Sequence, residues 1–206
     1  MRKLEIMEHV HILRVQGSYD SAFIEEVEQA SGQRVRNCYQ CGNCSATCGF
    51  TRFYDYPVNQ IMRLVQLGQK DLVLSSRSVW LCAGCQGCTT RCPCNIDVAR
   101  VMEVLRTLSR REGKVSDQDV RTFYDEFLRS VKTFGRVFET GLLPTFGLLA
   151  RKPFTDLDLA PKVLKKGKLS LLPHRIGKRG EVAGIFERFE ERRQREADRR
   201  TEDDGC

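Results

Sequence analysis

Two four-cysteine runs with identical internal spacing constrain this chain more than any other feature of its sequence. The first run reads CYQCGNCSATC and the second reads CAGCQGCTTRC, and each has the form C-x2-C-x2-C-x3-C. Their cysteines stand at an offset of 44 residues: Cys38, Cys41, Cys44 and Cys48, then Cys82, Cys85, Cys88 and Cys92. Apolar residues follow each run at helical spacing. A cysteine loop followed by a helix, present twice, predicts a duplicated supersecondary unit.

The chain holds 10 cysteines in 206 residues, and most of them fall between Cys38 and Cys94. Secreted disulfide scaffolds are shorter, denser in cysteine and carry an export signal. Acidic residues interrupt the first thirty positions, so no signal peptide is expected there. We therefore expect a cytoplasmic protein, in which thiols stay reduced and clustered cysteines indicate metal.

The spacing of each run is the bacterial ferredoxin pattern for a [4Fe–4S] cluster. Three cysteines at steps of three reach three iron corners of a cube, and in two-cluster ferredoxins the fourth cysteine of one run serves the other cluster. Applied here, this rule predicts two ligand sets, Cys38, Cys41, Cys44 and Cys92 for one cluster and Cys82, Cys85, Cys88 and Cys48 for the other.

Structural zinc is the main alternative, because it is often held by two C-x2-C pairs. Zinc has little use for a third evenly spaced cysteine, and disulfides fit the pattern less well still. Two cysteines lie outside the runs. Cys94 is either an alternative ligand or, as we favour, a bystander thiol. Cys206 ends a polar tail that fits no prenylation motif, so we expect it to be inert.

The chain is basic, with a formal net charge of +7 and a pI of about 9.0. Around the cysteines, Lys and Arg exceed Asp and Glu. This excess either offsets the negative charge of the clusters or is ordinary surface charge. No dinucleotide or nucleoside-triphosphate motif is present, so we expect no catalytic residue. The longest apolar stretch, near residues 141–150, is far below the roughly 20 residues of a membrane span.

The periodicity predicts a mostly α fold, with a short N-terminal strand possible around Val10 and Ile12. Helices are expected over residues 21–31, after each cysteine run, and over residues 120–134. Asp55 and Asn95 are the expected caps of the two helices after the runs. We divide the chain into an N-terminal strand and helix segment (1–32), a dicluster domain (33–113), a helical and basic docking extension (114–186) and a charged tail (187–206).

The phrases NCYQCGNCSATC and WLCAGCQGCTTRCP resemble the iron–sulfur C subunit of heterodisulfide reductase, and more broadly the alpha-helical ferredoxin domains of related oxidoreductases. The basic segment APKVLKKGKLSLLPHRI also resembles bacterial members of this family, so the resemblance covers about residues 5–180. It implies an electron relay between two other subunits, of which one bears flavin and the other is cysteine-rich and disulfide-active. This chain has no CCG-type motif, so the disulfide site is expected on another chain. Gly49 and Cys94 depart from the family pattern.

Two other functions stay open at this point. The chain is alternatively a relay for a related oxidoreductase, in sulfur oxidation or a methylene-tetrahydrofolate reductase assembly, or an iron–sulfur protein that senses redox state. The Leu- and Phe-rich residues 137–150, interrupted by Gly141, Pro144 and Gly147, either cover a partner, touch a membrane surface or close a local core. The basic residues 151–180 suit an acidic protein partner. We expect no nucleic-acid binding, because no such motif accompanies them.

Overall fold

The computed structural model describes residues 19–150, 165, 172–173 and 176–203. The chain forms two compact units, Met1–Gln118 and Asp119–Cys206. Every regular element in the described ranges is helical, which confirms the mostly α class. The strand considered near Val10 lies outside these ranges, as does Cys206.

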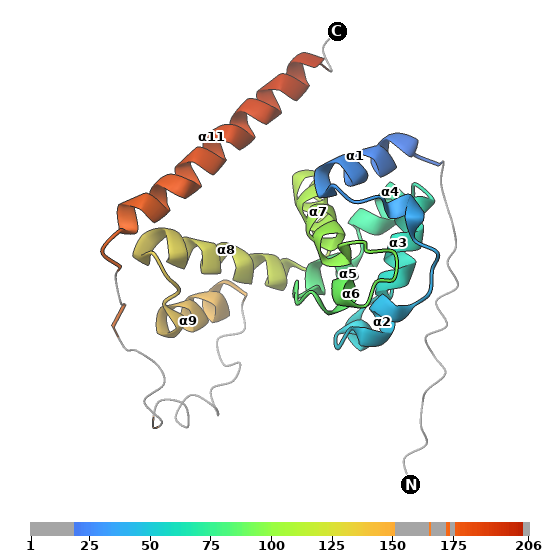
Figure 1. Ribbon diagram of the computed structural model, residues 1–206. Coiled ribbons are helices and arrows are strands. Elements are labelled where there is room, and N and C mark those ends of the chain that lie inside the picture. The colour runs from blue at the N-terminus through green and yellow to red at the C-terminus, as the bar shows by residue number, and fades with distance from the viewer. Residues whose placement is uncertain (1–18, 151–164, 166–171, 174–175, 204–206) are drawn as a thin grey trace. The chain divides into compact units, whose positions relative to one another are not determined.

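The first unit consists of short helices packed together with the longer helices α1, α3 and α7 (Figure 1). In chain order these are α1 (Ser21–Ser31), η1 (Val35–Asn37), α2 (Asn43–Thr47), η2 (Thr51–Phe53), α3 (Val58–Gln66), α4 (Lys70–Leu74), α5 (Arg77–Leu81), α6 (Gly87–Thr90) and α7 (Val98–Arg111). The second unit contains α8 (Gln118–Phe134), which begins at the boundary, α9 (Glu139–Leu149) and α11 (Arg179–Asp203).

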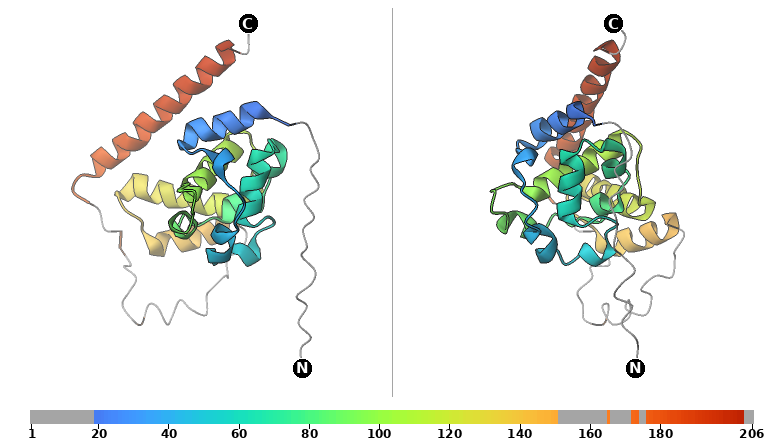
Figure 2. Two further views of the ribbon diagram at one scale, coloured as in Figure 1. Left: turned by 45° about the vertical axis from the view of Figure 1, so that its right-hand side comes forward. Right: turned by 90° about the vertical axis from the view of Figure 1, so that its right-hand side faces the viewer.

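The core of the first unit is built from the apolar faces of α3 and α7. The predicted stripes are confirmed, since the following residues are all buried: Val58, Ile61, Met62 and Val65 on α3, and Val98, Val101, Met102, Leu105 and Leu108 on α7. Full burial of one such side chain contributes about 1.5–3 kcal/mol. Helix α7 packs against α1, α4, α5 and α6 (Figure 2). Trp80 of α5 is fully buried, and its indole Nε1 donates to the Ser109 hydroxyl of α7 at 3.0 Å.

The helix caps differ from the two that the sequence led us to expect. Asp20 caps α1 through Oδ1, which accepts from the Phe23 backbone N–H at 2.9 Å, and Gly32 ends the helix in the left-handed region. Asp97 rather than Asn95 caps α7, because Asn95 has a positive φ of 52° and belongs to the preceding turn. The predicted cap Asp55 does not bind the first turn of α3; its carboxylate lies at the start of α5 instead.

Gly68, two residues after the end of α3, is required by both conformation and space. Its φ is +62°, and a Cβ at this position would lie 2.5 Å from the backbone nitrogen of Asp20. A glycine therefore allows the end of α3 and the start of α1 to approach each other at the backbone.

The second unit is held by aromatic contacts. Phe123 of α8 and Phe146 of α9 meet edge to face, with ring centroids 5.6 Å apart. Helix α9 runs through Pro144, so the stretch that the sequence showed as interrupted forms one helix and partly closes a local core. In α11, Arg195 and Glu191, which are four residues apart, form an ion pair at 3.6 Å. Within the described residues, no helix is long and apolar enough to cross a membrane.

Two cysteine-lined cavities as the candidate site

The cysteines of the two runs line two separate cavities in the first unit. The first cavity is lined by four of them, Cys38, Cys41, Cys44 and Cys92, and also by Cys94. The second is lined by four of them: Cys48, Cys82, Cys85 and Cys88. Each cavity therefore takes three cysteines from one run and the last cysteine of the other run. The eight predicted site residues lie in the two groups that the ferredoxin rule assigns.

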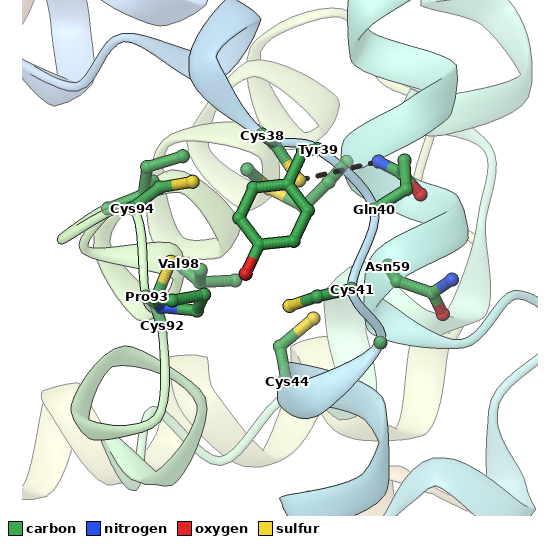
Figure 3. A pocket seen from close by; sticks show the side chains of 13 residues that line it. Cys38, Tyr39, Gln40, Cys41, Cys44, Asn59, Cys92, Pro93, Cys94 and Val98 are labelled. Atoms are coloured by element: carbon green, nitrogen blue, oxygen red, sulfur yellow. Dashed lines mark hydrogen bonds between the residues drawn. The ribbon is translucent and has the colours of Figure 1, made fainter.

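Cys94 is the residue whose position the sequence did not indicate. It lies in the first cavity with the four predicted cysteines, and Figure 3 shows these side chains around one space with the ring of Tyr39 among them. Its thiol donates to the Asn37 carbonyl at 3.2 Å. The 44-residue offset relates Cys94 to Phe50, which lines the second cavity.

Left-handed residues bend each cysteine loop at the same two positions. In both runs the residues directly before and after the second cysteine have positive φ, and these are Gln40 (64°), Gly42 (81°), Gly84 (64°) and Gln86 (65°). Such residues turn the chain tightly, so cysteines three apart can face one space. The third cysteine of each run then lies on a short helix, Cys44 on α2 and Cys88 on α6.

A side chain from the following long helix holds the first cysteine of each run. Gln66 of α3 donates from Nε2 to the Cys38 carbonyl at 2.8 Å and to the Val35 carbonyl at 3.1 Å. Arg106 of α7 donates to the Cys82 carbonyl, and from Nε to the Val79 carbonyl at 3.1 Å. The two residues are not at equivalent repeat positions. Gln66 is neutral and Arg106 is positively charged, so the side chains that anchor the two loops differ in charge.

Polar groups also reach the sulfurs themselves. The Gln40 side-chain amide donates to Cys38 Sγ at 3.4 Å. In the second cavity the Cys48 thiol donates to the Tyr54 hydroxyl at 3.7 Å, and Tyr54 is only 8% exposed. The repeat equivalent of Tyr54 is Val98, which lines the first cavity and has no polar atom in its side chain.

Burial keeps several of these thiols in their protonated form when no metal is present. Desolvation, followed by the neighbouring Cys82, raises the pKa of the Cys88 thiol to about 11. Burial likewise raises the pKa of Cys38 and of Cys44 above the ordinary value of 9.0. Thiolate is the form that binds metal, so loading at neutral pH would release protons.

The donor set fits iron–sulfur clusters. Thiolate sulfur is the ligand type of [4Fe–4S] clusters, and each iron takes one. In the described part of the chain, no three Cys, His, Asp or Glu side chains converge closely enough to hold a single metal ion. The cysteine side chains instead line the walls of the two cavities, and this arrangement suits a cluster of several metal atoms.

The basic residues near the cysteines are partly neutralised by acids from other segments. Arg36 pairs with Glu28 at 2.5 Å, and Lys70 pairs with Glu112 at 2.6 Å. Arg77 pairs with Asp117 at 3.0 Å. Because acidic partners neutralise them, these three cations are better interpreted as ordinary surface charges than as charges that offset the negative clusters.

The comparisons with known proteins point to the same chemistry. Residues 34–96 match the family described as a 4Fe-4S dicluster domain. The C subunit of the H(2):CoB-CoM heterodisulfide,ferredoxin reductase of Methanothermobacter thermautotrophicus is 33% identical over 97 residues, which cover 47% of this chain and 52% of that protein. The iron-sulfur C subunit of the CoB--CoM heterodisulfide reductase of Methanopyrus kandleri is 35% identical over 94 residues, or 45% of this chain and 49% of that protein.

A longer match covers more of both chains at lower identity. A protein of Archaeoglobus profundus, described as similar to the C subunit of heterodisulfide reductase, is 27% identical over 157 residues, which cover 72% of this chain and 81% of that protein. The chain spans about half the length of the two relatives named before it. The matched residues 34–96 include both cysteine runs and therefore all the cysteines that line the two cavities.

Proposed function

We propose that this chain, which is similar to the iron–sulfur C subunits of heterodisulfide reductase, is an electron-transfer subunit with two [4Fe–4S] clusters. Cys38, Cys41, Cys44 and Cys92 hold the first cluster, and Cys82, Cys85, Cys88 and Cys48 hold the second. The observation that carries the proposal is the sorting of these cysteines into two cavities, each completed by the last cysteine of the other run.

The clusters supply one-electron redox chemistry, and the chain supplies their setting. Thiolates hold the irons, and the Gln66 and Arg106 side chains fix the loops that present Cys38 and Cys82. Gln40 donates to the Cys38 sulfur, and the Tyr54 hydroxyl can donate to Cys48 once that sulfur is a thiolate; such hydrogen bonds tune the potential. Cys41 and Cys85 are exposed, so each cavity opens toward the surface of the unit, where a partner's redox centre can approach.

The proposed partners are two other subunits of a cytoplasmic complex, with this chain as the relay between them. One of them bears flavin, and the other is cysteine-rich and disulfide-active. The second unit of this chain is the proposed docking element. Its helices keep large apolar side chains exposed, and these are Leu128, Leu143, Leu148, Leu149, Ile185 and Phe189. Such surfaces mark protein interaction sites when they are contiguous.

The first test is metal content and electron transfer. The anaerobically purified chain should contain about eight irons and as many acid-labile sulfides, because two [4Fe–4S] clusters hold that number. Its visible absorption should be bleached by dithionite and restored by an oxidised flavoprotein. Zinc without sulfide would contradict the cofactor assignment. A loaded chain that exchanges no electrons with any flavoprotein would favour the sensor alternative.

The second test concerns the crossing of ligands between the runs. Cys48→Ala should remove the second cluster, because Cys48 lies in the cavity of the second run. Electron paramagnetic resonance of the reduced variant should lose one cluster signal, and Cys85→Ala should remove the same one. Cys206→Ala is the control and should retain both signals. If Cys48→Ala instead matches Cys41→Ala, each run holds its own cluster and the crossed assignment is wrong.

A further inference from the structure

The two cavities are related by the repeat but differ in their number of thiols. The first cavity has five cysteines and the second has four. The difference arises at one repeat position, which is Cys94 in the second half and Phe50 in the first. A [4Fe–4S] cluster takes four thiolates, so the first cavity contains one more donor than it needs.

The local backbone places Cys94 beside Cys92. Pro93 lies between them, and the Asn95 backbone N–H donates to the Cys92 carbonyl at 3.2 Å, which closes a turn. Proline favours the second position of such a turn, since its φ is already set. Asn95 then leaves the turn with a φ of 52°. Two cysteines on one tight turn therefore lie at the same cavity.

Cys94 is also close to the loop of the first run. Its thiol donates to the Asn37 carbonyl at 3.2 Å, and Asn37 directly precedes Cys38. A carbonyl acceptor of this kind holds a thiol only while the thiol keeps its proton, so the contact can be given up when the sulfur becomes a metal ligand. Figure 3 shows the Cys94 side chain on the same wall of the cavity as Cys92 and Pro93.

We propose that Cys94 is a reserve ligand of the first cavity, able to take the place of Cys92 as the fourth thiolate of the cluster. The substitution involves no change in oxidation state. The Cys92 sulfur leaves its iron and takes up a proton, while the Cys94 thiol gives up a proton and binds. The second cavity has no such reserve, because Phe50 occupies the equivalent position. This proposal rests on the proposed function, which supplies the cluster.

The test is a comparison of the two halves in the full-length chain, with alanine as the replacement because it offers no donor atom. Cys92→Ala should retain about eight irons, as the wild type does, since two [4Fe–4S] clusters remain. Cys92→Ala/Cys94→Ala should fall to about four. Cys48→Ala should also fall to about four, because no reserve exists there. Adding Phe50→Cys to Cys48→Ala should restore part of the lost iron.

Thiol alkylation followed by peptide mass spectrometry gives an independent readout. In the loaded Cys92→Ala chain, Cys94 should be protected from iodoacetamide, and removal of iron with a chelator under denaturing conditions should expose it. If the wild type holds no cluster, the proposed function itself fails. If the wild type is fully loaded while Cys92→Ala loses half its iron, fails to fold or leaves Cys94 open to alkylation, Cys94 is not a reserve ligand and the proposed function stands.

Discussion

Tyr54 is the residue that most clearly separates the two cavities in chemistry. Its hydroxyl is buried beside Cys48, and burial together with the neighbouring Cys82 and Cys48 sulfurs raises its pKa far above the ordinary value of 10.0. The phenol therefore stays protonated at neutral pH. A protonated hydroxyl can donate to a thiolate sulfur, which stabilises the more negative, reduced state of a cluster and raises its potential.

Removal of this hydroxyl tests that role. Tyr54→Phe should lower the potential of the second cluster by tens of millivolts, because one hydrogen bond is worth on the order of 1 kcal/mol. The first cluster should keep its potential, since Val98 is the equivalent residue there. Redox titration followed by electron paramagnetic resonance measures both values. Tyr19→Phe, at a side chain that is 63% exposed, is the control. If Tyr54→Phe changed the potentials of both clusters equally, a local hydrogen bond could not be the cause.

At the scale of elements, Asp55 joins the loop after the first run to the helix before the second run. Its carboxylate accepts from the Arg77 backbone N–H at 2.8 Å, the Ser78 backbone N–H at 3.0 Å and the Ser76 hydroxyl at 2.7 Å. These donors lie at the start of α5, where a negative charge also suits the helix dipole. Helix α5 leads directly into Cys82, so this contact positions the second cysteine loop.

Neutralising Asp55 should therefore destabilise the first unit. Desolvation alone would raise the pKa of this carboxyl, but hydrogen bonds from Ser78, Ser76 and the backbone outweigh it and hold the pKa below the ordinary 3.8. The contribution to stability is then present above that value and is lost as the pH falls through the lower pKa of the folded state. Asp55→Asn should cost roughly 1–3 kcal/mol near neutral pH.

Denaturant unfolding, followed anaerobically by circular dichroism, measures this effect. The difference in free energy of unfolding between wild type and Asp55→Asn should become smaller as the pH falls below 3.8, since the wild-type carboxylate then becomes protonated and loses its charge. Asp71→Asn is the matched control. That carboxylate pairs with Lys114 but is 89% exposed, so its loss should cost less than about 1 kcal/mol. If the difference in unfolding free energy between wild type and Asp55→Asn does not change with pH, the charge of Asp55 has no effect on stability.

At the scale of the whole molecule, the buried apolar cluster and both cavities belong to one compact unit. The buried cluster runs from Phe23 to Leu108, within Met1–Gln118. The second unit has its own aromatic contacts, including Phe134 with Phe138 at 5.7 Å, but no residue of α8 is fully buried. We infer that cluster binding depends on the first unit and partner docking on the second.

Truncation tests this division of roles. A chain that ends at Gln118 should load about eight irons, as the full chain does, and should no longer copurify with partner chains. A chain that ends at Glu103 is the matched control. It removes Leu105 and Leu108 from the core, and each large core side chain is worth about 2–5 kcal/mol, so it should not retain clusters. Failure of the Gln118 chain to load would place part of the cluster support in the second unit.

The sequence by itself determined the chemical class of the site and the helices that carry it. Donor type, the repeated spacing and the stripes of α3 and α7 are short-range properties, since they depend on residue identity and on periods of three to four residues. The helix caps were less certain. Asp97 and Asn95 stand two residues apart, and only backbone conformation decides which of them is the cap.

Tertiary packing decided the rest. It placed Cys94 in the first cavity, brought the Tyr54 hydroxyl to Cys48, and gave Asp55 its partners on α5 rather than on α3. In the cases of Cys94 and Asp55 the contact joins groups more than twenty residues apart, and no local periodicity encodes such a distance. Which groups such a side chain contacts depends on how the apolar faces of the neighbouring helices pack together, because that packing fixes the positions of the helices.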